Sequence, residues 1–116
     1  PESNSYCGVS QSVKQKDKPD WSGLPPVVYA DGATRDRMLT YMPGVMSNLD
    51  RHEWTKHGTC ARMSADKYFN LAMDLVAKMA DARTGQLIRA NVGKDVAASD
   101  LCKTLTDDLG AGVAPP

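Results

Sequence analysis

Both histidines of this 116-residue chain lie in one short segment, together with a glutamate and a lysine. The four ionisable residues are His52, Glu53, Lys56 and His57. Successive residues of a helix advance by roughly 100°, which places Lys56 about 40°, Glu53 about 100° and His57 about 140° from His52. If the segment is helical, all four side chains therefore share one face, and Trp54 points away from it. That face is too polar to be part of a core. It is also too dense in titratable groups to be an ordinary surface.

These four residue types suit chemistry on a phosphodiester. A histidine exchanges protons near neutral pH and can act as a general base or acid. A lysine is a positive point charge that can stabilise negative charge building on phosphate oxygens, and a glutamate can orient either neighbour. The alternative interpretation is a charged helix surface, where Glu–Lys pairs contribute only ~0.2–0.5 kcal/mol each. The residues by themselves leave both interpretations open.

Other reaction classes fit the sequence less well. His52-Glu53 resembles the start of a zinc-protease HExxH motif, but that motif needs histidines at i and i+4. Here the second histidine is at i+5, and Lys56 occupies the ligand position, where its charge would repel zinc. No GxSxG elbow is present, and Cys60 is better suited to a disulfide than to a nucleophile. We predict that the protein uses no metal and no cofactor.

Four helices are predicted to position these residues. The helix that carries the ionisable cluster should run from Leu49 to His57, with Gly58 as a left-handed cap. A helix before it should begin near Thr34 and end before Pro43. A later helix should be capped by Ser64, end before Gly85 and bury an apolar stripe. The stripe comprises Tyr68, Leu71, Leu75, Val76 and Met79. The last helix should begin after Ser99, stop at Gly110 and place Leu101, Cys102, Leu105 and Leu109 on one face.

Residues 1–26 are predicted to be loop, and their charged run, 14–20, to be a solvated surface rather than an RNA-binding one. Val27–Tyr29 is a candidate strand. Lys and Arg balance Asp and Glu, fourteen against fourteen, so net charge identifies no nucleic-acid partner. No apolar run reaches the ~20 residues of a membrane span. We predict one domain over residues 1–116, with no membrane association.

The segment 52–60, His-Glu-Trp-Thr-Lys-His-Gly-Thr-Cys, resembles the second active-site motif of the ribonuclease T2 family, most closely its bacterial branch. Looser similarity extends over residues 37–113. The resemblance implies an α+β fold, an antiparallel sheet packed with helices, of which this chain would be mostly the helical middle portion. It also implies metal-independent cleavage of single-stranded RNA, in which the ribose 2′-hydroxyl attacks the adjacent phosphate and leaves a 2′,3′-cyclic phosphate. His57 would be the general base, Glu53 and Lys56 would stabilise the transition state, and His52 would help to bind the phosphate.

The resemblance further implies a monomer, a periplasmic or secreted location, and a disulfide between Cys7 and Cys60 that leaves Cys102 over. One departure is important, because the family's earlier motif, HGLWP, supplies a histidine as general acid and has no match here. We expect that motif, and C-terminal strands, to lie outside this chain, which by itself should then be inactive. The motif could instead sit on a separate, cleaved segment. In the remaining alternative the chain is a catalytically inactive RNA- or protein-binding module on the same scaffold.

Overall fold

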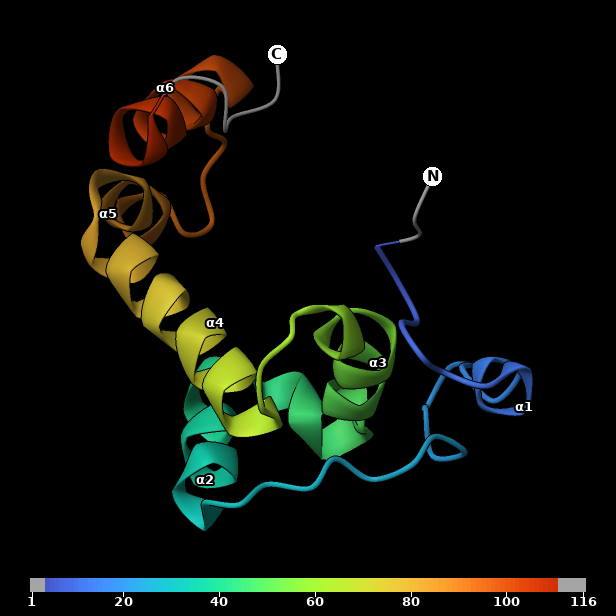
Figure 1. Cartoon of the computed structure of the whole chain (residues 1–116). Helices are drawn as coiled ribbons and strands as arrows, with labels where there is room; N and C mark the ends of the chain where they lie inside the picture. Colours follow the sequence, from blue (N-terminus) through green and yellow to red (C-terminus); the bar gives the residue numbers. More distant parts are fainter. Residues whose placement is uncertain (1–3, 111–116) are drawn as a thin grey trace. The chain divides into compact units, whose positions relative to one another are not determined.

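The computed structural model describes residues 4–110, which form two compact units that divide between residues 73 and 74. The first unit contains α1 (Gln11–Lys14), α2 (Gly32–Tyr41), the 3₁₀ turn η1 (Pro43–Ser47), α3 (Leu49–Lys56) and the 3₁₀ turn η2 (Gly58–Cys60). The long helix α4 (Ala65–Asp81) begins in the first unit and ends in the second. The second unit also holds α5 (Arg83–Ala90) and α6 (Ala98–Leu109). Figure 1 shows these elements in order along the chain.

The predicted α+β fold is wrong for the part of the chain that the structure describes. Residues 4–110 contain helices, turns and loops but no strand, so there is no antiparallel sheet for the helices to pack on. Val27–Tyr29 is not a strand, and the Val28 side chain is 84% exposed. A strand needs a neighbour for its backbone hydrogen bonds, and no other described segment supplies one. The short helix α1 also replaces part of the loop predicted over residues 1–26.

The core lies in the first unit, where α2, η1 and α4 meet. Five residues form it, namely Met38, Val45, Ala65, Phe69 and Met73, with Tyr29, Trp54 and Tyr68 packed against its edge. The apolar stripe predicted for α4 is therefore misplaced. Phe69 and Met73 are fully buried, whereas Leu71, Leu75 and Val76 are about half exposed, between 44% and 54%. Tyr68 is half-buried and lies at the edge of the buried face.

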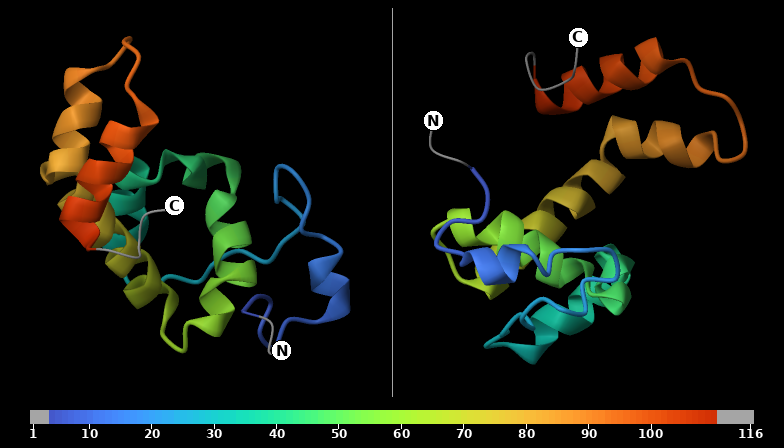
Figure 2. Two further views of the ribbon diagram at one scale, coloured as in Figure 1. Left: turned by 90° about the horizontal axis from the view of Figure 1, so that it is seen from above. Right: turned by 90° about the vertical axis from the view of Figure 1, so that its right-hand side faces the viewer.

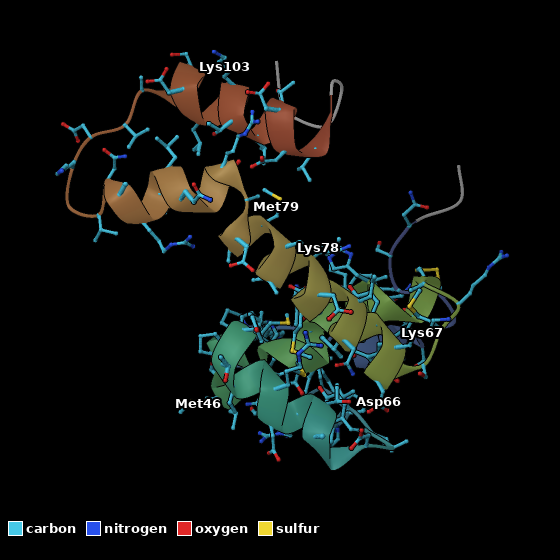
Figure 3. All side chains as sticks on the ribbon, turned by 90° about the vertical axis from the view of Figure 1, so that its left-hand side faces the viewer. Met46, Asp66, Lys67, Lys78, Met79 and Lys103 are labelled. Atoms are coloured by element: carbon cyan, nitrogen blue, oxygen red, sulfur yellow. A yellow bond between two sulfur atoms is a disulfide. The ribbon has the colours of Figure 1, made fainter. Side chains whose placement is uncertain are left out.

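Asp66, in the first turn of α4, joins that helix to the start of α2. Its carboxylate accepts hydrogen bonds from the backbone N–H groups of Ala30 and Asp31 and from the Thr34 hydroxyl, at 2.8, 3.1 and 2.7 Å. Figure 3 labels Asp66 beside the first turns of α2. Helix α2 begins at Gly32, capped by Asp31, two residues before the predicted start at Thr34. Thr34 is buried and donates to Asp66 instead of capping the helix.

In the second unit α5 and α6 lie side by side, as both views of Figure 2 show. The backbone N–H and hydroxyl of Thr84 both donate to the Asp108 carboxylate, at 2.8 and 2.6 Å. Gly85, predicted to follow the end of a helix, lies inside α5. A Cβ there would come within 2.2 Å of the Ala80 carbonyl oxygen, so glycine permits close packing instead of ending the helix. Gly110 does end α6, with φ +93°.

An open apolar cavity of about 530 Å³ lies in this second unit, between the end of α4 and α5. Leu75, Val76, Met79 and Ile88 line it, and Figure 3 labels Met79 near the end of α4. Three residues of the predicted stripe, Leu75, Val76 and Met79, therefore border a cavity instead of filling a core. Across residues 4–110, none of the helices is both long enough and apolar enough to cross a bilayer.

Candidate active site

Helix α3 carries the ionisable cluster, and the helix begins where the sequence predicted. It follows Asn48, which adopts a left-handed backbone conformation, φ +62°, that asparagine tolerates well. The helix ends at Lys56, with His57 as its C-terminal cap. The predicted helical spacing of His52, Glu53, Lys56 and His57 is therefore present, apart from the last residue, which lies at the cap.

The two histidine rings are close together on this face. Their centroids are 6.3 Å apart and the rings are nearly perpendicular. His52 is half-buried, with 20% of its side chain exposed, whereas His57 is exposed to solvent. An exposed imidazole can reach a substrate and exchange protons with it, and a half-buried one is held more firmly by its neighbours.

Glu53 and Lys56 are half-buried beside the histidines, and their charges are felt by neighbouring groups. Burial raises the pKa of the Tyr68 phenol, and the negative charge of Glu53 raises it further. The positive charge of Lys56 helps to lower the pKa of Asp17. The cluster thus places one negative and one positive side chain next to two imidazoles.

Trp54 fixes which face of α3 points outward. Its ring packs against Tyr68 and Phe69, with centroids 5.8 and 6.4 Å away. It therefore lies on the core side of the helix, opposite the ionisable face, as its position in the sequence predicted. Burying the indole on one side keeps the catalytic candidates on the other.

Gly58 was predicted to be a left-handed cap, and this prediction is wrong. Its φ is not positive, and the residue starts the 3₁₀ turn η2. Glycine is required for a different reason, because a Cβ at this position would lie 2.1 Å from Cε3 of Trp54. The glycine lets the chain turn directly over the indole ring, immediately after His57.

The N-terminal segment, residues 6–24, is bound along α3. The backbone N–H of Tyr6 donates to the Lys56 carbonyl at 2.7 Å. Cys7 and Cys60 form a disulfide, with Cα atoms 5.1 Å apart, which is the pairing that the family resemblance implied. Cys102 forms no disulfide.

Two polar side chains of α3 and its cap hold the far end of this segment. Asn48 Nδ2 donates to the Asp20 carbonyl at 3.0 Å. Arg51 Nη1 donates to the carbonyls of Ser22 and Leu24 at 3.2 and 3.1 Å. Together with the disulfide, these contacts hold residues 6–24 against α3, beside its ionisable face.

Asp17 is a member of the site that sequence reasoning missed, because the charged run 14–20 was interpreted as a solvated loop. Its side chain is only 3% exposed, and Oδ1 lies 2.7 Å from Nδ1 of His52. The Trp21 ring packs against the same imidazole, with centroids 5.3 Å apart. The one available signal was a lone acidic residue between lysines, and nothing local indicated contact with a histidine 35 residues away.

Within residues 4–110 no three His, Cys, Asp or Glu side chains are grouped so that they could hold a metal ion. The site's polar atoms instead consist of imidazole nitrogens, one ammonium and two carboxylates. This set can move protons and stabilise an anion.

Comparison with known proteins gives an independent result. The chain is similar to Ribonuclease I of Escherichia coli (strain K12), with 32% identity over 69 residues, which is 58% of this chain and 26% of that protein. The matched part thus spans about a quarter of the relative's length. No solved structure matches the chain. The model of the family described as Ribonuclease T2 family matches residues 2–113, and the chain therefore belongs to the ribonuclease T2 family.

Proposed function

We propose that this chain carries part of the active site of an endoribonuclease that cleaves single-stranded RNA without a metal. The observation that supports this most directly is the paired imidazoles of His52 and His57, 6.3 Å apart beside Glu53 and Lys56. Membership of the ribonuclease T2 family and similarity to a protein named Ribonuclease I point to the same substrate class.

In the proposed reaction His57 removes the proton from the ribose 2′-hydroxyl. The oxygen then attacks the adjacent phosphorus, and the bond to the 5′-oxygen breaks to leave a 2′,3′-cyclic phosphate. His57 suits the role of base because it is exposed and free to approach the sugar. Lys56 would stabilise the negative charge on the five-coordinate phosphorus, Glu53 would hold the cationic groups in place, and His52 would bind a phosphate oxygen.

The leaving 5′-oxygen must receive a proton, and we propose that a histidine outside these 116 residues gives it. The sequence contains only His52 and His57, and both are already assigned. On this proposal residues 1–116 form an incomplete domain that is inactive by itself and gains activity when the remaining segments are present. We also propose that the enzyme is monomeric and acts in the periplasm or outside the cell, where the Cys7–Cys60 disulfide would persist.

The test uses the complete protein that contains this chain and a single-stranded RNA substrate. We expect His57→Ala to lower kcat/KM by about 10²–10⁴-fold, the usual effect of losing a general base, with an unchanged thermal unfolding midpoint. Products of the wild type should carry 2′,3′-cyclic phosphate ends, and EDTA should leave the rate unchanged.

Lysine variants provide a matched control. Lys56→Ala should slow cleavage, whereas Lys67→Ala should not, because Lys67 is an exposed residue on α4 outside the cluster (Figure 3). Full activity of the His57 variant would refute the assigned base. Loss of activity in EDTA with recovery in zinc would refute the mechanism. RNA binding without any cleavage by the complete wild-type protein would favour the inactive binding module.

A further inference from the structure

The imidazole of His52 is backed by a buried carboxylate that the proposed mechanism does not use. We propose that Asp17 is a positioning residue, which holds His52 with its proton on Nδ1 and so leaves Nε2 as the nitrogen that meets the RNA phosphate. This inference rests on the proposed function for the identity of the ligand. The state of the His52 ring can be measured without any substrate.

The hydrogen bond between the two residues fixes the tautomer. Asp17 Oδ1 and His52 Nδ1 are 2.7 Å apart, and the Asp17 side chain is 3% exposed. An ionised carboxylate only accepts hydrogen bonds, so Nδ1 must carry the hydrogen whether the imidazole is neutral or protonated. In the neutral ring Nε2 is then an acceptor, and in the protonated ring it is a second donor. The protonated ring is the form that can donate from Nε2 to a phosphate oxygen.

A second contact keeps the Asp17 carboxylate ionised and in place. The Tyr6 hydroxyl donates to Oδ2 at 2.6 Å, so each carboxylate oxygen has its own hydrogen-bond partner. Burial opposes ionisation, but the hydrogen bonds from Tyr6 and His52, with the charges of His52 and Lys56, outweigh it and lower the pKa of Asp17. The same hydrogen bond raises the pKa of Tyr6 to about 12, so the phenol remains a donor at neutral pH.

The plane of the His52 ring is fixed as well. Trp21 packs against the ring at 5.3 Å with an interplanar angle of 31°, and His57 meets it edge-on. Asp20 and Trp21 both have positive φ, +73° and +50°, a conformation that costs free energy for residues other than glycine. The hydrogen bond from Asn48 to the Asp20 carbonyl helps to hold this strained turn. The strained residues, Asp20 and Trp21, thus lie in the loop whose side chains Asp17 and Trp21 contact His52.

Orientation matters because a misdirected imidazole loses its contact with the phosphate. Residues that hold the second nitrogen of a functional histidine set its tautomer and its direction. Without Asp17, His52 would populate both tautomers and turn more freely. Binding of the phosphate should weaken, and the transition state should be stabilised less.

The tautomer is read directly by ¹⁵N NMR of the histidine-labelled 116-residue chain, under conditions in which the imidazole rings are neutral. We expect the proton on Nδ1 in the wild type and a mixture of tautomers in Asp17→Asn. Asp50→Asn is the matched control, since Asp50 is also buried and accepts a tyrosine hydroxyl, from Tyr29 at 2.7 Å. Its variant should keep the wild-type His52 signals. A wild-type proton on Nε2, or identical His52 signals in Asp17→Asn and the wild type, would overturn the proposal.

If Asp17→Asn fails to fold, the wild-type spectrum and the spectrum of Tyr6→Phe still test the proposed tautomer of His52. That variant removes only the far partner of Asp17, and we expect the proton to stay on Nδ1. Movement of the proton to Nε2 would contradict the assignment.

In the complete enzyme, Asp17→Asn should raise KM for RNA and lower kcat/KM by about 10–100-fold, by analogy with the loss of a partner that orients a metal-bound histidine. A loss of folded protein alone would lower apparent kcat and leave KM unchanged. Asp50→Asn should keep the wild-type KM. An unchanged KM in Asp17→Asn would refute positioning, whereas failure of the His57 experiment would refute the reaction and leave the tautomer result standing.

Discussion

At the scale of single residues, Gly58 and Trp54 show how packing constrains the motif. The indole is buried against Tyr68 and Phe69, and the chain passes over it directly after His57. A side chain at position 58 would overlap the ring, so the position of His57 depends on a missing Cβ. The glycine and the tryptophan act as one unit that sets the end of α3.

We therefore expect Gly58→Ala to destabilise the first unit by roughly 1–3 kcal/mol, the usual effect of overpacking a well-filled site. Urea unfolding followed by tryptophan fluorescence measures this, because Trp21 and Trp54 both lie in the first unit. Gly32→Ala is the control. A Cβ at position 32 would meet nothing within 4 Å, and the residue begins a helix, so its stability should stay near the wild-type value. Equal stability of the two variants would show that Trp54 can move aside at no cost.

The residues of the site divide into those that local pattern predicts and those that it does not. His52, Glu53, Lys56 and His57 were predictable because helical spacing alone places them on one face. Asp17 was not, since its contact with His52 spans 35 residues and depends on the path of a loop. Gly58 was identified correctly as a special position but for the wrong reason, because a close approach to Trp54 depends on tertiary packing and leaves no local signal.

At the scale of elements, the segment 6–24 and helix α3 are joined by a covalent clamp. The Cys7–Cys60 disulfide connects positions 53 residues apart in the sequence. Cys7 directly follows Tyr6, whose backbone N–H donates to the Lys56 carbonyl. The disulfide thus fixes the start of the segment whose later residues, Asp17 and Trp21, contact His52. The clamp should therefore contribute both to stability and to the geometry of the site.

Replacing the clamp by Cys7→Ser with Cys60→Ser should lower the free energy of unfolding, by up to about 4 kcal/mol if chain entropy alone decides. Urea unfolding under non-reducing conditions, again followed by tryptophan fluorescence, gives the value. Cys102→Ser is the control, because Cys102 forms no disulfide and lies in the second unit, and it should leave this transition in place. A double variant that unfolds at the wild-type urea concentration would show that the noncovalent contacts suffice to bind the segment.

Secondary structure was predictable from sequence where capping and turn residues act locally. Leu49 as the start of α3 and Gly110 as the end of α6 follow from such signals. The sheet was inferred from the family resemblance and not from a strand pattern, and residues 4–110 do not contain it. The prediction of which face of α4 is buried was also wrong, because the apolar residues of this helix are spread widely around it. Only the partners of a helix decide which of its apolar residues become core.

At the scale of the whole molecule, the two units have very unequal cores. The buried hydrophobic residues among 4–110 are Leu24, Met38, Val45, Ala65, Phe69 and Met73, and all belong to the first unit. In residues 74–110 only Thr84 is buried. Its hydrogen bonds to Asp108 are thus central to the contact between α5 and α6. Since apolar burial supplies most of the folding free energy, local opening should be easier in the second unit.

Hydrogen–deuterium exchange measured by mass spectrometry tests this difference. Peptides from α5 and α6 should exchange faster than those from α2 and the first half of α4, because segments with little buried apolar surface open at lower free energy. Asp108→Ala should speed exchange in α5 and α6 and leave the first unit unchanged. The neighbouring Asp107→Ala is the control. Asp107 pairs with Arg83 at 3.8 Å, both side chains are exposed, and such surface pairs contribute little. Equal protection of the two units would contradict easier opening of the second unit. Equal effects of the two variants would show that the hydrogen bonds between Thr84 and Asp108 do not hold α5 to α6.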